Sequence, residues 1–168
     1  MRFKSPFVLL AWGFLATMAR AEHASIDLRI MRVDAQTGKE KDEVSASVHQ
    51  EPPGEIVDQR PQFKAKAGEP LVLQFIFKNT YPHGEKKDVR IRYFVVRETQ
   101  PKQKSVPDLR EGVVTQGRFT LNFKPQGRVG ARQAFTIKEP GSYLLRLQSE
   151  NTDSDHEHFS AIDILVEK

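Results

Sequence analysis

The sequence predicts an all-β protein: one antiparallel β-sandwich of about seven to eight strands behind an N-terminal signal peptide. Apolar and polar residues alternate with a period of two along most of the chain after residue 21, and almost no stretch repeats with the period of a helix. Glycine and proline separate the alternating stretches at short intervals, which is typical of sandwiches and barrels. The chain contains no cysteine, so we expect its apolar core to hold the fold without disulfides.

Residues 1–21 predict a cleavable secretory signal. Arg2 and Lys4 precede an apolar run at residues 7–19, and Ala19-Arg20-Ala21 fits the small-residue rule for cleavage. The run spans about 13 residues, against roughly 20 for a helix that crosses a bilayer. We therefore expect residues 22–168 to form one exported domain, periplasmic or extracellular, with no stable membrane insertion after cleavage. Retention of the run as a membrane anchor is the alternative.

Removal of the signal changes the charge of the chain. Arg2, Lys4 and Arg20 leave without any acidic residue, so the net charge falls from +4 to about +1. The remaining basic residues are scattered rather than gathered in one stripe, which argues against nucleic acid as a partner. The lack of cysteine and of Asn-x-Ser/Thr acceptor sites in a secreted chain indicates a bacterial source.

Two strong strands are predicted in the first half of the domain, at residues 26–33 and 71–78. One face of each is apolar: Ile26, Leu28 and Ile30 in the first, and Leu71, Leu73, Phe75 and Phe77 in the second. We expect the second of them at the centre of one sheet. Weaker signals between them predict a turn at residues 36–39, a short edge strand at 44–48, a proline loop from 51 and an edge pairing at 62–64.

The predicted partner of the central strand is at residues 89–96. Its inward residues are Val89, Ile91, Tyr93 and Val95, and Arg90 and Arg92 point outward. The connection at residues 79–88 is long enough to cross between two sheets. Residues 97–112 are rich in charge and contain two prolines, so they predict a solvated, mobile loop.

Three further segments complete the predicted sandwich. Phe119, Leu121 and Phe123 alternate into a tight turn at residues 124–127. Residues 135 and 137 belong to the returning strand. The last strand is predicted at residues 159–166, where Ile162, Ile164 and Val166 point inward.

The stretch Glu139-Pro140-Gly141-Ser142-Tyr143-Leu144-Leu145 resembles the tyrosine corner of immunoglobulin-like and fibronectin-like sandwiches. The resemblance implies that the Tyr143 hydroxyl bonds to backbone near the corner, and that Leu145 stands where antibody domains have a disulfide cysteine. It also implies an Ig-like order of strands. The motif covers few residues and implies no function, because this fold hosts many.

The five histidines support two interpretations. In one they are surface imidazoles. In the other, the Ig-like order brings the N-terminus and two loops to the same end, so that His23, His83, His156 and His158 gather there. His156 and His158 are two residues apart, and in an extended chain both would point to the same side. Imidazole suits Cu(II) and Zn(II), which makes a copper or zinc site one hypothesis.

Calcium is a further, less favoured ligand for the same end of the sandwich. Residues 149–157 are acidic and rich in oxygen ligands. They lack the glycine and the closing glutamate of an EF-hand loop, and Asn and Asp are also common in ordinary turns. No cofactor is established by the sequence.

Catalytic signals are absent from the sequence. There is no cysteine nucleophile, no serine in a G-x-S-x-G elbow and no phosphate-binding loop. The one tryptophan, Trp12, leaves with the signal, so no flat aromatic platform for sugar stacking is predicted. We therefore expect a protein that is not an enzyme.

The predicted function is an exported module that binds an unidentified protein or has a structural role outside the cytoplasm. One candidate surface combines the outward Arg90 and Arg92 with the apolar Phe94 and Val96 of the same segment. Solubilising charge on an exposed strand is the other interpretation of this surface. Metal binding by the loop histidines is the alternative function.

Overall fold

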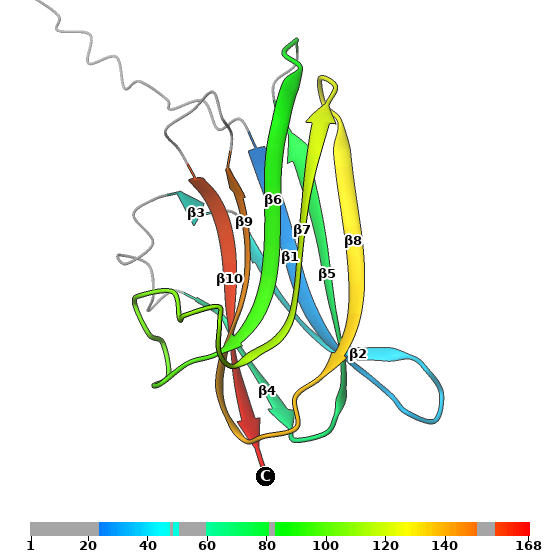
Figure 1. The fold of residues 1–168 in the computed structure, drawn as a ribbon. Coiled ribbons are helices and arrows are strands. Elements are labelled where there is room, and N and C mark those ends of the chain that lie inside the picture. Colours follow the sequence, from blue (N-terminus) through cyan, green and yellow to red (C-terminus); the bar gives the residue numbers. More distant parts are fainter. Residues whose placement is uncertain (1–23, 48, 51–59, 81–82, 151–156) are drawn as a thin grey trace, which may run out of the picture.

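The structure, a computed structural model, describes residues 24–47, 49–50, 60–80, 83–150 and 157–168, and in these ranges the chain forms ten strands and no helix. The strands make two sheets that pack face to face (Figure 1). The predicted all-β sandwich is thereby confirmed. Within the same ranges no helix is long and apolar enough to cross a membrane. The predicted signal peptide lies outside them.

The first sheet has four antiparallel strands in the order β2-β1-β5-β8. Their bounds are β1 Ala24–Val33, β2 Glu40–Ser47, β5 Pro70–Asn79 and β8 Arg128–Thr136. β5 lies inside the sheet and β2 at its edge, as the alternation of their residues predicts. A shift in register between Ile30 and Arg32 marks where β2 leaves the regular pairing.

The second sheet has six strands. β3 (His49–Gln50), β10 (Glu157–Glu167), β9 (Gly141–Glu150), β6 (Lys86–Arg97) and β7 (Val113–Phe123) follow one another, and β4 (Gln62–Lys66) also pairs with β10. The β4–β10 pair is parallel, so the sheet is not purely antiparallel as expected. β3 and β4 share the edge of β10 and raise the count above seven to eight strands. The edge pairing predicted at 62–64 is confirmed as part of β4, whereas the two residues of β3 are too few to show an alternation.

One predicted pairing is wrong. Residues 89–96 do form a strand with the expected inward face, but β6 pairs with β7 and β9 in the second sheet. It faces β5 across the core and is not hydrogen-bonded to it. The connection between β5 and β6 therefore crosses between sheets, as its length allows.

The main core lies between the sheets and contains the alternating apolar residues of both. Its fully buried large side chains include Leu28, Ile30, Leu73, Phe75, Ile91, Leu145 and Leu147. The Tyr143 ring is buried in this core, and its hydroxyl donates a hydrogen bond to the Glu139 carbonyl at 2.9 Å. The predicted tyrosine corner, with its bond to nearby backbone, is present.

A second, smaller apolar cluster covers the outer face of the six-stranded sheet. It consists of Phe94, Val96, Leu144, Phe159 and Ala161, with Leu109 and Val113 packed against them. Two expectations are wrong here. Phe94 and Val96 are completely buried and cannot form an exposed protein-facing surface. Residues 97–112 are not simply a solvated loop, because Leu109 lies on the sheet and the Glu98 side chain is fully buried.

Candidate functional site

The sequence-predicted metal site lies mostly outside the described part of the chain. His23 and His156 belong to undescribed segments, and of His158 only the backbone, at the start of β10, is described. His83 is exposed in the connection between β5 and β6. Among the residues that the structure does describe, no group of three or more His, Cys, Asp or Glu is placed to hold a metal ion.

The strand ends next to these histidines do lie at one end of the sandwich. Ala24 pairs with Asn79, Glu150 with Glu157, and Arg90 with Glu150. This places the start of β1 beside the end of β5 in one sheet and the end of β9 beside the start of β10 in the other, and a small cavity lined by Ala24, Asn79 and Ser149 joins the two ends. Coordination by His23, His83, His156 and His158 stays a prediction.

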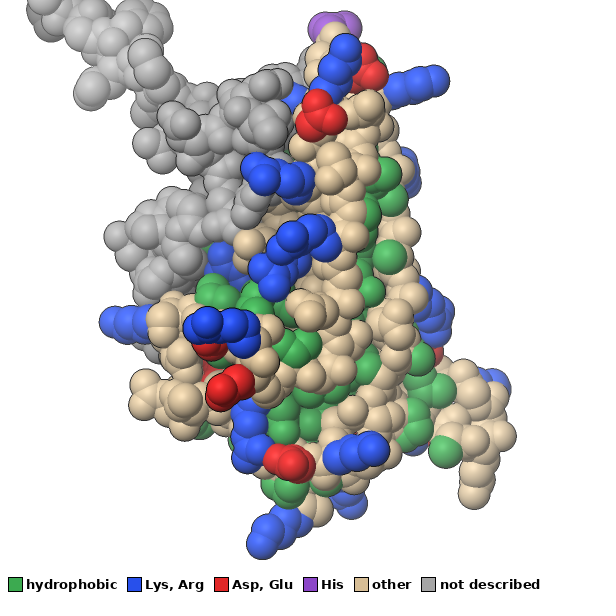
Figure 2. All heavy atoms as spheres, in the orientation of Figure 1, with side chains coloured by type: hydrophobic (Ala, Val, Ile, Leu, Met, Phe, Trp, Pro, Cys, Tyr) green, Lys and Arg blue, Asp and Glu red, His purple; other side chains and the backbone are tan. Residues whose placement is uncertain are grey.

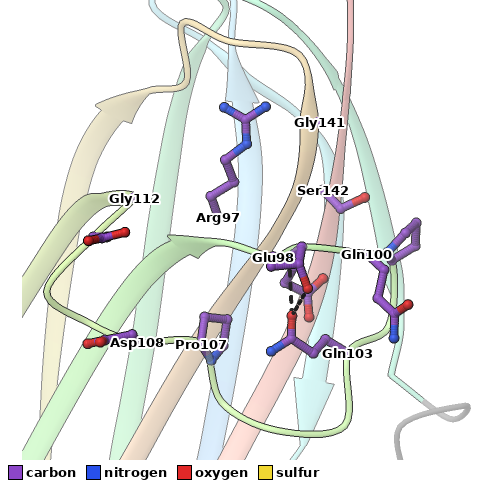
Figure 3. A pocket seen from close by; sticks show the side chains of 12 residues that line it. Arg97, Glu98, Gln100, Gln103, Pro107, Asp108, Gly112, Gly141 and Ser142 are labelled. Atoms are coloured by element: carbon purple, nitrogen blue, oxygen red, sulfur yellow. Dashed lines mark hydrogen bonds between the residues drawn. The ribbon is translucent and has the colours of Figure 1, made fainter.

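A different site is formed by the loop at residues 98–112, between β6 and β7. This loop folds back toward the start of β9 and borders an open pocket of about 730 Å³ (Figure 3). The floor comes from the strand ends and includes Arg97, Gly141 and Ser142, and the loop supplies the walls. Apart from Pro101 and Pro107, the loop side chains that line it are polar or charged: Glu98, Thr99, Gln100, Gln103, Asp108 and Glu111.

The loop is held in place by backbone contacts at its ends. Arg97 N donates to Gly112 O and Glu98 N donates to Ser142 O, each at 2.9 Å. Gln103 closes the first turn, because its Oε1 accepts hydrogen bonds from both the Thr99 amide and the Thr99 hydroxyl (Figure 3). A loop fixed in this way has already lost much of the entropy that binding would otherwise cost.

Below the loop, a buried guanidinium is shared by two carboxylates. Nη2 of Arg60 lies 2.9 Å from Asp163 Oδ1 of β10 and 3.4 Å from Glu98 Oε1. The same nitrogen donates to the Gln103 carbonyl at 3.2 Å, which ties the middle of the loop to the cluster. The three charged side chains are nearly or fully buried, with exposed fractions of 6%, 5% and 0% for Arg60, Asp163 and Glu98.

The electrostatics of this cluster are unbalanced. Burial raises the pKa of Glu98, and the negative charge of Asp163 raises it further, while the Arg60 guanidinium acts in the opposite direction. Burial likewise raises the pKa of Asp163, opposed by Arg60 and by Lys102. Within the described residues, Arg60 Nε and Glu98 Oε2 have no hydrogen-bond partner. One guanidinium therefore compensates two buried carboxyls incompletely.

The exposed wall of the pocket has different chemistry. Asp108 is bound by Arg110, at 2.7 Å between Oδ2 and Nη2, and these hydrogen bonds lower the pKa of the Asp108 carboxyl. Gln100 and Glu111 are exposed and line the pocket. The walls thus offer amide donors and acceptors together with carboxylate acceptors, a set that suits hydrogen bonding to a polar chain.

Sequence reasoning missed Arg60, Glu98 and Asp163. Asp163 carries the one usable signal: a lone carboxylate between the core residues Ile162 and Ile164 of a strand whose two faces are both buried. Nothing in the sequence around Arg60 marks it, because its partners are 38 and 103 positions away and meet it only through the fold.

No family model matches this sequence, and no curated protein matches it. Several solved structures share a β-sandwich arrangement. The C-terminal domain of Wzt aligns over 87% of this chain and 74% of its own, with 10% identity and a TM-score of 0.44. The PmoD soluble domain from Methylocystis sp. ATCC 49242 (Rockwell) aligns over 84% and 90%, with 12% identity and a TM-score of 0.42.

A chitin binding domain from Burkholderia pseudomallei aligns over 66% of this chain and 59% of its own, with 14% identity and a TM-score of 0.42. All three TM-scores are below 0.5 and all three identities are below 25%. These likenesses assign neither a family nor a function to this chain.

Proposed function

We propose that this chain is an exported, non-enzymatic β-sandwich module that binds another protein through the pocket of the loop at residues 98–112. Export is supported by the basic start, short apolar run and Ala19-Arg20-Ala21 at the N-terminus. The binding role rests on one observation: a pocket of about 730 Å³, lined largely by polar residues, whose loop is anchored from beneath by a buried ion cluster.

The buried contacts that anchor the loop indicate that it does more than connect two strands. A plain connection between two neighbouring strands needs only a few residues. This one is longer and buries a charged side chain at a cost. Its course is fixed by hydrogen bonds that Gln103 accepts, from the Thr99 amide on its side-chain oxygen and from Arg60 on its carbonyl. Rigid scaffolds that present such loops commonly use them for recognition.

The pocket chemistry favours an extended polypeptide segment as the bound group. Exposed amide and carboxylate groups of Gln100 and Glu111 can pair with the donors and acceptors of a peptide backbone. The surface is polar and open, which fits the rim of a protein interface better than an enclosed site for a small apolar molecule.

Site-specific photocrosslinking in cells that produce the protein tests this proposal. A photoreactive amino acid at Gln100 or at Glu111 should give the same crosslinked protein, identified by mass spectrometry. The same group at Gln36, an exposed residue in the turn between β1 and β2, is the matched control and should not capture it.

A second variant connects the crosslink to the anchored loop. Arg60→Met removes the shared guanidinium and with it the bond to the Gln103 carbonyl, so the crosslink yield at Gln100 should fall. Equal capture at Gln36 and Gln100, or no specific product at either pocket position, would contradict the proposal.

A further inference from the structure

Three arginines lie together on the outer face of the six-stranded sheet, beyond the small apolar cluster. Arg92 of β6 is directly opposite Arg118 of β7, and Arg90 is two residues before Arg92 on the same face. With Ile91 and Gln148 of β9 they line a cavity of about 120 Å³. Figure 2 shows basic side chains gathered along this face of the molecule.

The position of Arg92 opposite Arg118 is unfavourable for folding alone. Like charges directly opposite on paired strands destabilise a sheet. Other arginines in the sheets do have carboxylate partners: Arg29 contacts Asp27 at 2.7 Å and Arg32 contacts Glu69 at 3.1 Å. Within the described residues, neither Arg92 nor Arg118 forms an ion pair with a carboxylate, and no acidic side chain lines the cavity.

Contacts with neighbouring side chains position the hydrogen-bond donors of the cavity for a bound acceptor. The Arg92 guanidinium lies 5.6 Å from the centre of the buried Phe94 ring, which holds it against the sheet. Arg146, itself buried, donates from Nε to Gln148 Oε1 at 2.9 Å. Because that oxygen is occupied, Gln148 has its amide NH₂ to offer to a bound group. The cavity therefore presents donors and positive charge.

We propose that this cavity, lined by Arg90, Arg92, Arg118 and Gln148, is a binding site for a phosphate or sulfate group. Planar guanidinium groups bind such oxyanions through paired, charge-assisted hydrogen bonds. A bound group with two negative charges would offset the repulsion between Arg92 and Arg118. The site is separate from the pocket of the 98–112 loop, and the proposal does not depend on the proposed function.

Isothermal titration calorimetry with inorganic pyrophosphate tests the site, with the ionic strength held near 0.1 M by sodium chloride. Arg92→Gln and Arg118→Gln should each weaken binding roughly 10- to 100-fold, since each removes charged hydrogen bonds. Arg128→Gln is the matched control: Arg128 is exposed on β8 of the other sheet, and its removal should leave the dissociation constant unchanged.

A stability measurement separates loss of the site from loss of the fold. Without pyrophosphate, Arg118→Gln should raise the denaturant midpoint, because it relieves the repulsion with Arg92. Arg118→Glu should raise it further by pairing with Arg92, and should abolish binding. A merely structural role for Arg118 would instead lower the midpoint in both variants.

The group could be a free ion or the headgroup of a lipid, and a second arm distinguishes these sources. Vesicles of phosphatidylcholine with phosphatidic acid are compared with phosphatidylcholine alone in a sedimentation assay. Arg118-dependent binding to either pyrophosphate or the acidic vesicles supports the proposal and identifies the source. Binding to neither, or equal loss with Arg128→Gln, overturns it.

Discussion

Tyr143 shows how one side chain can fix the start of a strand. Its ring lies in the main core while its hydroxyl bonds to the Glu139 carbonyl, four residues earlier in the chain. The turn before β9 is thus held to the strand that follows it. Gly141, at a φ of 148°, supplies the backbone conformation that this turn needs and that other residues rarely adopt.

Replacing Tyr143 with Phe should reduce the free energy of unfolding by about 1 kcal/mol, because one buried hydrogen bond is lost and the ring is kept. Tyr93→Phe is the control, since the structure gives the Tyr93 hydroxyl no hydrogen bond to a described residue. Urea unfolding of both variants measures the difference. Equal midpoints for the two variants would show that the hydrogen bond from the Tyr143 hydroxyl to the Glu139 carbonyl does not stabilise the fold.

The buried cluster gives a pH dependence whose sign follows from the raised pKa of Glu98 and of Asp163. A carboxyl with a raised pKa stabilises the fold below its ordinary pKa, and this contribution is lost as the pH rises through the raised value. Glu98→Gln leaves one carboxyl for Arg60. The variant should therefore match the parent near pH 3.5 and gain stability over it toward pH 7.5.

Urea unfolding across this pH range measures the gain. Glu111→Gln, an exposed carboxyl change in the same loop, should alter the free energy of unfolding by no more than about 0.5 kcal/mol. A difference between Glu98→Gln and the parent that is constant with pH would show that the pKa of Glu98 is the same in the folded and the unfolded protein.

At the scale of elements, β6 and β7 are joined by more than their hydrogen bonds. Tyr93 of β6 is opposite Gly117 of β7, and its ring covers the glycine so closely that a methyl group built there would overlap the ring. An aromatic side chain over a cross-strand glycine fills the space that the glycine leaves. The centre of the same ring also lies 5.7 Å from the centre of the Phe75 ring across the core.

Gly117→Ala should therefore cost about 1 to 3 kcal/mol, because the Tyr93 ring must move from its place in the core. In a Tyr93→Leu background the same change should cost little, since no ring is there to be displaced. A double-mutant cycle of unfolding free energies measures the coupling. Additive effects of the two changes would mean that the ring does not rest on Gly117.

The strands were predictable from the sequence and the loop site was not, for a physical reason. The inward face of a strand such as β5 can be read from its own residues, because apolar residues recur at every second position from Leu71 to Phe77. Glu98 and Arg60 acquire their roles only from each other, through contacts distant in the sequence. Short β3 escaped detection because two residues cannot show a period, whereas the predicted edge pairing at 62–64 covers part of β4.

For the whole molecule, the first prediction concerns maturation. The described fold begins at Ala24, which pairs with Asn79, so a cut after Ala21 would leave every described strand intact. The exported product should start at Glu22, because Ala19-Arg20-Ala21 fits the small-residue rule for signal-peptidase cleavage. Intact-mass analysis of the secreted protein checks this. A membrane-bound product that retains residues 1–21 would contradict it.

The two outermost strands of the chain also determine how the domain would respond to force. Figure 1 shows that β1 starts at one end of the sandwich and β10 finishes at the opposite end. Each is paired on both sides, β1 with β2 and β5, and β10 with β9 on one side and β3 and β4 on the other. Because the ladder bonds run across the strands, a pull between the ends loads them together in shear. A tethered copy should therefore yield abruptly at high load instead of unzipping bond by bond.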